Sequence, residues 1–355
     1  MMQFRFRQVK IPDTPLPQMS SIDDLPKVFK RTSHVHVEER AKDWSEKFSF
    51  PMIVGSLIHA MVHTRPDIAY ALSVLSRFMS KPELHHFKAA NYLLRYLKGT
   101  SHIGLRYDKA EILRSFKEMK NILTGAVDSS FADCSLSARS TSGFILWYGG
   151  CALDWECKRQ PLVTMSTMEA EYVAASKCVL AIRALNKLVN FVGLYGTSPI
   201  QVLEDNAACV AIASHPVHRQ RSRHIAVKYH NVRDACQNRE VELVQVWTRH
   251  QVADIFTKSL SRDLFQNFRD VLFGYDTKKD PMIADTYFYR DLVAAVPKPD
   301  ETTKQLHQIS KGCSCGEVPR SVSEYVKSNT FFVSYQVPLM PNTCAGELMG
   351  YYEFD

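Results

Sequence analysis

The chain has 355 residues, of which 45% are hydrophobic and 23% charged. This is the composition of a folded protein with room for two domains, and it excludes a chain that is disordered throughout. Its longest apolar stretch, residues 50–62, is shorter than the roughly 20 residues that cross a bilayer, so no membrane span is expected. The formal net charge of +7 is compatible with a nucleic-acid partner but does not by itself indicate one.

The amino terminus and the cysteines favour an intracellular protein, in the cytoplasm or the nucleus. The first ten residues mix charged and aromatic side chains and contain neither an apolar signal core nor a cleavage site. The nine cysteines are an odd number, and their closest pair, Cys313 and Cys315, lacks the second pair that a zinc site requires. We therefore expect free thiols.

The first part of the chain is predicted to contain a lead-in followed by helices. Residues 1–44 are polar and interrupted by prolines, which is typical of a linker. Thr64 is expected to cap one helix, and Ser80 and Glu83 to form the capping box of the next. Residues 45–110 are therefore expected to form a small helical segment.

A change of pattern after about residue 120 predicts a mixed sheet. Strands are expected at residues 124–128, 141–148, 151–155, 200–204 and 241–247. Helices are expected at residues 166–192, at 206–213 and at 252–260. A further helix is expected to follow the basic loop at 218–224 and to end near residue 236. The first three strands form an antiparallel meander, and the later alternation of strand and helix gives a mixed five-stranded sheet with helices on its faces.

Acidic residues fall where these elements would bring them together. Asp128 and Asp205 end the first and fourth strands, whose ends meet if the two strands are neighbours. The long helix can then place Glu171 beside them, and Asp254 lies in the expected last helix. Carboxylates this close repel one another unless cations lie between them, and oxygen ligands suit Mg²⁺ or Mn²⁺. Two such ions about 4 Å apart are a known arrangement for phosphodiester cleavage.

Each of these carboxylates also has a purely structural interpretation. Asp205 precedes a helix and could be its N-cap, Asp128 could be a turn residue, and Asp254 a solvated helix acid. Glu169 and Glu171 are two positions apart and do not share a helix face. Glu169 is therefore assigned to the capping box that opens the helix, whereas the small residues that follow Glu171 let the helix approach the sheet closely.

Several long motifs follow one another between residues 45 and 272: TRPDIAYALSVLSRFMSKP, AANYLLRYLKGT, STSGFILWYGG, KRQPLVTMSTMEAEYVAAS, LEDNAACVAIA, RHIAVKYHNVRD and VADIFTKSL. In these motifs the sequence resembles the C-terminal part of copia-type LTR retrotransposon polyproteins. The resemblance implies that residues 45–110 are the connection that follows a reverse transcriptase. It also implies that residues 120–272 are a ribonuclease H-like domain, with a mixed five-stranded sheet and flanking helices.

The same resemblance implies hydrolysis of the RNA strand of an RNA–DNA hybrid, and a reverse transcriptase domain of the same element as a second partner. The implied catalytic residues, which would hold two Mg²⁺ or Mn²⁺ ions, are Asp128, Glu171, Asp205 and Asp254. The basic residues expected to contact phosphates, if they are not simply solvated, are Lys158, Arg159, Arg221, Arg223 and His224.

The sequence also departs from the family pattern. Ser130 and Ala226 stand where the family usually has acids, although neither position belongs to the metal-binding set. A polymerase Tyr-x-Asp-Asp motif, a protease motif and an integrase region are missing, so polymerase activity is not expected. Residues 273–355 stay unassigned: they contain a possible strand at 330–337, and a fused or mispredicted reading frame is preferred over a host-derived addition.

Two other functions remain open. A catalytically decayed remnant would bind nucleic acid through its basic loop in a salt-dependent way without turnover, but the intact acids argue against it. An integrase or resolvase core would share the sheet, but the STMEAEY and ADIFTK motifs argue against that interpretation.

Overall fold

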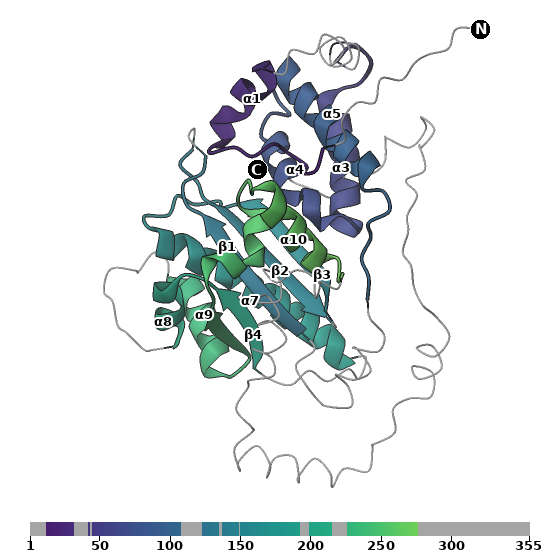
Figure 1. The fold of residues 1–355 in the computed structure, drawn as a ribbon. Helices are drawn as coiled ribbons and strands as arrows, with labels where there is room; N and C mark the ends of the chain where they lie inside the picture. The colour runs from purple at the N-terminus through teal and green to yellow at the C-terminus, as the bar shows by residue number, and fades with distance from the viewer. Residues whose placement is uncertain are drawn as a thin grey trace, which may run out of the picture.

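A mixed five-stranded sheet forms the centre of the molecule (Figure 1). The computed structural model describes residues 12–31, 42, 45–107, 123–134, 137–148, 150–191, 199–214 and 226–275. The sheet has the order β3-β2-β1-β4-β5 and consists of β1 (Leu123–Ser130), β2 (Thr141–Tyr148), β3 (Cys151–Arg159), β4 (Ile200–Glu204) and β5 (Val241–Gln245). β1, β2 and β3 are antiparallel, and β4 and β5 run parallel to β1. The predicted mixed sheet with flanking helices is confirmed.

Strand β2 shows how the sheet separates two layers of helices. Its residues are buried on both faces, and they alternate between two cores, as the period of two of a strand requires. Phe144 and Leu146 belong to the core under α7 (Thr167–Phe191), together with residues such as Tyr172. Ile145 and Trp147 belong to the core on the opposite face.

The first face is covered by α7, α8 (Ala207–Ser214) and α9 (Ala226–Gln237). α7 packs directly on β1 and β2, and α9 packs on α7. Ala174, Ala175 and Cys178 are buried at this contact, which confirms the expected close approach of the helix to the sheet.

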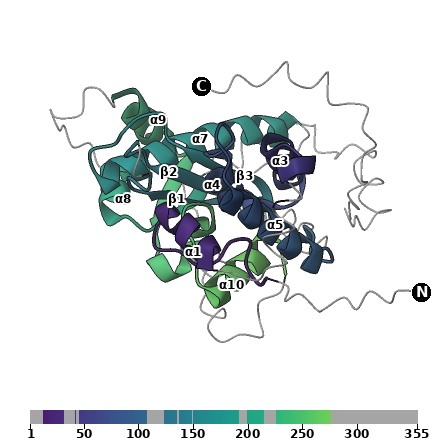
Figure 2. The same ribbon diagram turned by 90° about the horizontal axis from the view of Figure 1, so that it is seen from above.

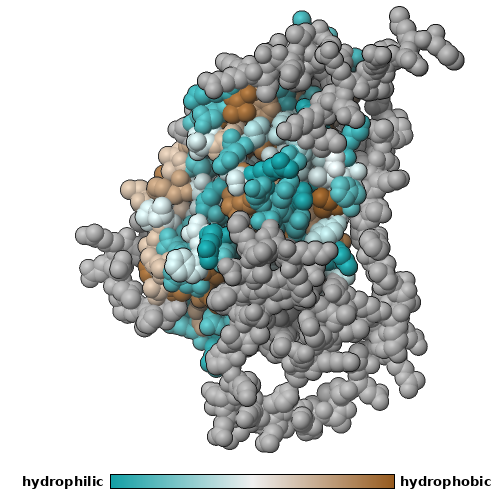
Figure 3. Space-filling view, viewed as in Figure 1, coloured by the Kyte–Doolittle hydropathy of each residue, from teal (hydrophilic) through white to brown (hydrophobic). Residues whose placement is uncertain are grey.

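The second face is covered by the short 3₁₀ segment η5 (Val252–Phe256), by α10 (Arg262–Leu272) and by helices from the amino-terminal part of the chain (Figures 1 and 2). These helices are α3 (Phe50–His63), α4 (Ala69–Ser76) and α5 (Leu84–Gly99). Figure 2 shows the strands between α7 and α9 on one side and α1 and α10 on the other. α10 buries its apolar stripe and turns its hydrophilic side outward, at the centre of the face in Figure 3.

Part of the expected linker is folded. The helix α1 (Leu25–Arg31) packs against α5 and contacts the 3₁₀ turn η1 (Ile22–Asp24), and Leu25 and Phe29 are buried in the core of the second face. Residues 12–31 thus contribute apolar side chains to the core. This differs from the expectation that residues 1–44 form a solvated linker.

Two predicted helix caps are wrong, and proline is the reason in both cases. Thr64 closes α3 instead of opening the next helix, because Pro66 forces Arg65 out of the helical conformation. The N-cap of α5 is Glu83, whose backbone N–H donates to Nδ1 of His86 at 2.8 Å, rather than Ser80. A helix starting at Ser80 would need a helical residue immediately before Pro82, which that proline disfavours.

The helix predicted at residues 252–260 is also wrong. The chain forms only the 3₁₀ turn η5 there, and a regular helix begins at Arg262. All residues of η5 are buried, because the turn lies between β1, β2 and the helices of the second face. A segment without a solvent-facing side has no amphipathic period, so the sequence pattern is uninformative here.

Within the described part of the chain, no helix is both long and apolar enough to cross a membrane. The cysteines described there are free thiols: Cys134, Cys151, Cys157, Cys178, Cys209 and Cys236. The possible strand at 330–337 and the Cys313 and Cys315 pair lie outside the described residues.

Candidate active site

Two parallel strands bring Asp128 and Asp205 to the same edge of the sheet. β1 and β4 are neighbours, with Ala126 opposite Leu203. Two residues further along, this register puts Asp128 level with Asp205, which directly follows β4. Asp128 lies within β1 opposite Gly143 of β2, so it is not a turn residue.

Asp205 is not the N-cap of the helix that follows it. That role belongs to Asn206, whose Oδ1 accepts hydrogen bonds from the backbone N–H groups of Ala208 and Cys209 at 3.0 and 3.1 Å. The interpretation of Asp205 as a helix N-cap is therefore excluded, and its carboxylate is available for another partner.

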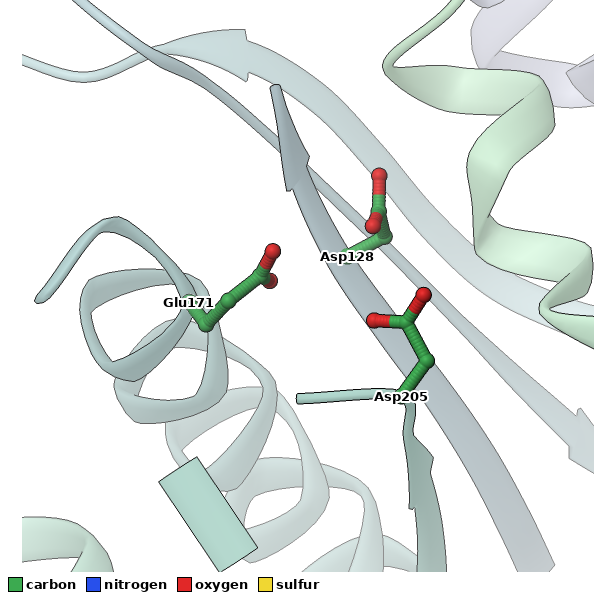
Figure 4. Close-up of side chains that lie close together, drawn as sticks. All are labelled: Asp128, Glu171 and Asp205. Atoms are coloured by element: carbon green, nitrogen blue, oxygen red, sulfur yellow. The ribbon is translucent and has the colours of Figure 1, made fainter. Parts of the chain in front are cut away.

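Glu171 reaches the same place from the other side of the site. It lies in the second turn of α7, and Ser166 and Glu169 hold the start of that helix. Oγ of Ser166 accepts from the N–H of Glu169 at 3.2 Å, and Oε2 of Glu169 accepts from the N–H of Met165 at 2.8 Å. The predicted division of roles is thus confirmed: Glu169 caps the helix, and Glu171 points toward the sheet (Figure 4).

Asp128, Glu171 and Asp205 direct their carboxylates into a common space (Figure 4). One oxygen from each of them lies within 4.8 Å of the others. Asp128 and Glu171 are buried, and Oε2 of Glu171 has no hydrogen-bond partner among the described residues. A buried carboxylate oxygen without a donor is costly unless a cation satisfies it, so this group fits a hard divalent ion.

Asp254 is not a member of that group but lies beside it. It is buried in η5, which excludes a solvated helix acid. Nζ of Lys258 donates to Oδ1 of Asp254 at 2.8 Å and to Oδ1 of Asp128 at 3.2 Å. Oγ1 of Thr257 donates a short hydrogen bond to Oδ2 of Asp128. The structure therefore brings three of the four predicted carboxylates together and links the fourth to them through a lysine.

Burial and mutual repulsion raise the pKa values of Glu171 and Asp254. For Glu171, burial and then the charges of its acidic neighbours raise the pKa well above its usual range. For Asp254, burial and then the charge of Asp128 raise the pKa to about 8, although Lys258 acts in the opposite direction. A bound divalent cation would relieve this repulsion.

Gln251 is a supporting residue that the sequence analysis missed. Its side chain is fully buried, and its Nε2 donates to the carbonyl oxygens of Val127 and Leu203 at 3.0 and 3.4 Å. These two carbonyls belong to β1 and β4 just before Asp128 and Asp205. Gln251 thus holds the two strand ends together where their pairing stops.

Thr257, Lys258 and Glu204 were missed as well. Glu204 is a further buried acid, immediately before Asp205 in the chain, and burial raises its pKa well above its usual range. For Lys258 the four-residue spacing from Asp254 was a visible signal. For Thr257 the sequence offered none, because its contact with Asp128 depends on how η5 packs on the sheet. Glu204 accepts from the N–H of Asn206 at 3.0 Å, and nothing in the strand pattern marks it as part of the site.

The predicted phosphate-contacting residues are described only in part. Lys158 and Arg159 are exposed at the end of β3, which runs in the same direction as β1 and therefore ends at the edge of the sheet that carries Asp128. Nη1 of Arg159 lies 3.9 Å from Sγ of Cys134. Arg221, Arg223 and His224 lie outside the described residues.

Sequence comparison finds relatives among transposon polyproteins. The chain is 30% identical over 246 residues to the retrovirus-related Pol polyprotein from transposon TNT 1-94 of Nicotiana tabacum, covering 69% of this chain and 18% of that protein. It is 35% identical over 216 residues to the corresponding polyprotein from transposon RE1 of Arabidopsis thaliana, covering 61% of this chain and 14% of that protein. The chain therefore spans less than a fifth of the length of these relatives.

No protein-family model matches the sequence. Among solved structures, the chain is similar to LC11-RNase H1 isolated from compost, with a TM-score of 0.30 and 14% identity over 39% of this chain and 93% of that one. It is also similar to RNase H1 from Halobacterium salinarum, with a TM-score of 0.29 and 12% identity over 41% of this chain and 98% of that one.

Proposed function

We propose that this chain, which belongs to the retrovirus-related Pol polyproteins of copia-type transposons, hydrolyses the RNA strand of RNA–DNA hybrids in a metal-dependent reaction. The observation that carries the proposal is the group formed by Asp128, Glu171 and Asp205, whose oxygens lie within 4.8 Å of one another. Reverse transcription is not proposed, because the sequence has no polymerase motif.

The three carboxylates would hold Mg²⁺ or Mn²⁺. When bound, such an ion supplies a Lewis acid for the phosphate and lowers the pKa of water. The unpartnered Oε2 of Glu171 supports this assignment, since it offers a buried acceptor to the ion. Two ions were expected from the family resemblance, and the fit of a second one depends on Lys258, which lies between Asp128 and Asp254.

The protein itself fixes the orientation of the carboxylates. Thr257 and Lys258 donate to Asp128 from one side, and Gln251 holds together the strand ends that carry Asp128 and Asp205. A site prepared in this way does not need to reorganise when a phosphate arrives, which is the usual source of electrostatic catalysis.

The proposed substrate is an RNA–DNA hybrid because the family resemblance implies it, and the positive charge at this edge of the sheet fits a phosphate backbone. Lys158 and Arg159 are exposed at the same edge of the sheet as the acidic group, and they would contact backbone phosphates. Hybrid would be recognised by the shape of its minor groove and by its 2′-hydroxyls rather than by sequence.

Cleavage of a labelled RNA–DNA hybrid with Mg²⁺ tests the proposal. Asp128→Asn is expected to reduce the rate by at least about 100-fold, because it removes a carboxylate that all the proposed metal chemistry requires. The matched control is Asp263→Asn, which changes an exposed acid of α10 and should leave the rate unchanged.

Two results would contradict the proposal: no cleavage by the unaltered protein, or equal cleavage by Asp128→Asn. Salt-dependent binding of hybrid without turnover would instead support a decayed remnant. Cleavage of a DNA duplex but not of hybrid would support an integrase-like or resolvase-like activity.

A further inference from the structure

The position of Lys258 bears on how many divalent ions this site takes. Nζ of Lys258 lies 2.8 Å from Oδ1 of Asp254 and 3.2 Å from Oδ1 of Asp128. A second divalent ion held by Asp128 and Asp254 would need the space between these two carboxylates, which the ammonium group of Lys258 fills. The ammonium group and a second divalent ion therefore compete for the same place.

We propose that Lys258 is a built-in cation that replaces the second divalent ion, so that this chain binds one such ion, at Asp128, Glu171 and Asp205. The inference rests on the proposed function only in that these carboxylates bind a divalent ion. It departs from the two-ion arrangement expected from the sequence.

The backbone keeps Lys258 in this position. Its N–H donates to the carbonyl oxygen of Asp254 at 2.9 Å, so the main chain and the side chain both fold back on the same residue. Its neighbour Thr257 is buried and donates to Oδ2 of Asp128. The turn therefore fixes the backbone of Lys258 next to both carboxylates.

Charge supports the same assignment. The ammonium group of Lys258 donates to both Asp128 and Asp254, at 3.2 and 2.8 Å, and so places a positive charge where a second ion would lie. Asp128 has enough lone pairs to accept from Lys258 and Thr257 and still bind an ion together with Glu171 and Asp205. Asp254 does not lie in the group formed by Asp128, Glu171 and Asp205, and its described side-chain partner is Lys258.

The number of bound ions tests the proposal without any assay of activity. Mn²⁺ alone is titrated into the full chain, and binding is followed by calorimetry and by the electron paramagnetic resonance signal of free Mn²⁺. The unaltered protein is expected to bind one ion at the site. Lys258→Gln should bind a second one, with an affinity at least about tenfold higher than any second binding to the unaltered protein.

Two variants serve as controls. Lys258→Arg keeps the positive charge and should still bind one ion. Lys177→Gln removes another ion-paired lysine, 2.8 Å from Glu156 on β3, and should leave the number of ions unchanged. Thermal unfolding of each variant establishes that it is folded.

Two bound ions in the unaltered protein would overturn the proposal, whether or not any variant folds. It would also be overturned if folded Lys258→Gln bound one ion only. Failure of the proposed function is distinguishable from failure of this inference. If the ions bind in the expected numbers but no hybrid is cleaved, the inference holds and the nuclease activity is refuted.

Discussion

Asp128 is the residue on which the site depends most. It accepts hydrogen bonds from Thr257 and Lys258, and it belongs to the three-carboxylate group with Glu171 and Asp205. Its place in β1 was predictable from the strand pattern. Its donors were not, because Lys258 is 130 residues away along the chain and reaches Asp128 only after η5 has packed on the sheet.

The raised pKa of Asp254 leads to a prediction about stability and pH. In the folded protein Asp254 keeps its proton up to a pKa of about 8, whereas an unfolded aspartic acid loses it at about 3.9. Between these values the folded state binds more protons, so the free energy of unfolding should fall as pH rises. From pH 6.5 to 8, we expect a loss of about 1 to 2 kcal/mol in metal-free protein, measured by urea unfolding.

Asp254→Asn should reduce this loss, because the amide does not titrate but can still accept a hydrogen bond from Lys258. The slope should not vanish, since burial also raises the pKa values of Glu171 and Glu204. Equal slopes in the variant and the unaltered protein would contradict the prediction.

At the scale of elements, a close contact between β2 and η5 supports the site. A Cβ at Gly143 would lie 2.6 Å from Cβ of Phe256 and 2.9 Å from Cγ2 of Thr257. The sheet and the 3₁₀ turn therefore meet at a place where only glycine fits. Because Thr257 donates to Asp128, this contact also sets the position of the acidic group.

Gly143→Ala is expected to lower the free energy of unfolding by about 2 to 3 kcal/mol, because Phe256 and Thr257 would have to move with their backbone. Gly125→Ala is the matched control on the neighbouring strand. Its added Cβ would lie 2.8 Å from Cδ2 of Leu146, the end of a flexible side chain, so it should cost less. Urea unfolding of both variants is the measurement, and a larger loss for Gly125→Ala would refute the argument.

Helix boundaries show how far local patterns reach. The start of α7 was predicted correctly because Ser166 and Glu169 make their contacts within a few residues. The start of α5 was not, because two capping residues compete there and Pro82 decides between them. Local signals are reliable where the cap and its partner are close and no second candidate is nearby.

At the scale of the whole molecule, the helical segment and the sheet share one core. Apolar residues of α3, α4 and α5 lie in the same cluster as Phe256, Phe265 and Phe268. Polar links cross the same boundary: Nη2 of Arg77 contacts Asp133 at 3.1 Å, and Nε1 of Trp155 donates to the carbonyl oxygen of Met61. The predicted helical connection is therefore one of the supports of the sheet.

A buried ion pair anchors the helical segment. Arg65 donates to both oxygens of Asp67, at 2.9 and 2.7 Å, and Tyr96 donates its hydroxyl to the same carboxylate at 2.5 Å. The guanidinium also donates to Thr100 and lies 5.9 Å from the ring centre of Phe273, just after α10. This network gives a structural reason for the TRPD and YLKGT motifs.

Asp67→Asn is expected to lower the free energy of unfolding by about 3 kcal/mol, because it leaves Arg65 buried without its counter-charge. Lys27→Gln, which removes the exposed pair between Lys27 and Asp24, is the control and should have a much smaller effect. Thermal and urea unfolding would measure both. An equal shift in the two variants would show that the Arg65 network does not anchor the segment.

The sequence by itself determined the strands, the long helix α7 and the places of Asp128, Glu171 and Asp205 along these elements, because the period of side chains along each element is a local rule. Their convergence was predicted on the condition that the first and fourth strands are neighbours, and the tertiary structure supplied that long-range pairing of Ala126 with Leu203. Only the tertiary structure decided the roles of Gln251, Thr257 and Lys258, the turn at η5 and the common core. Each of these depends on contacts between segments far apart in the chain, and no period or cap in the sequence encodes which distant side chain will satisfy a buried charge.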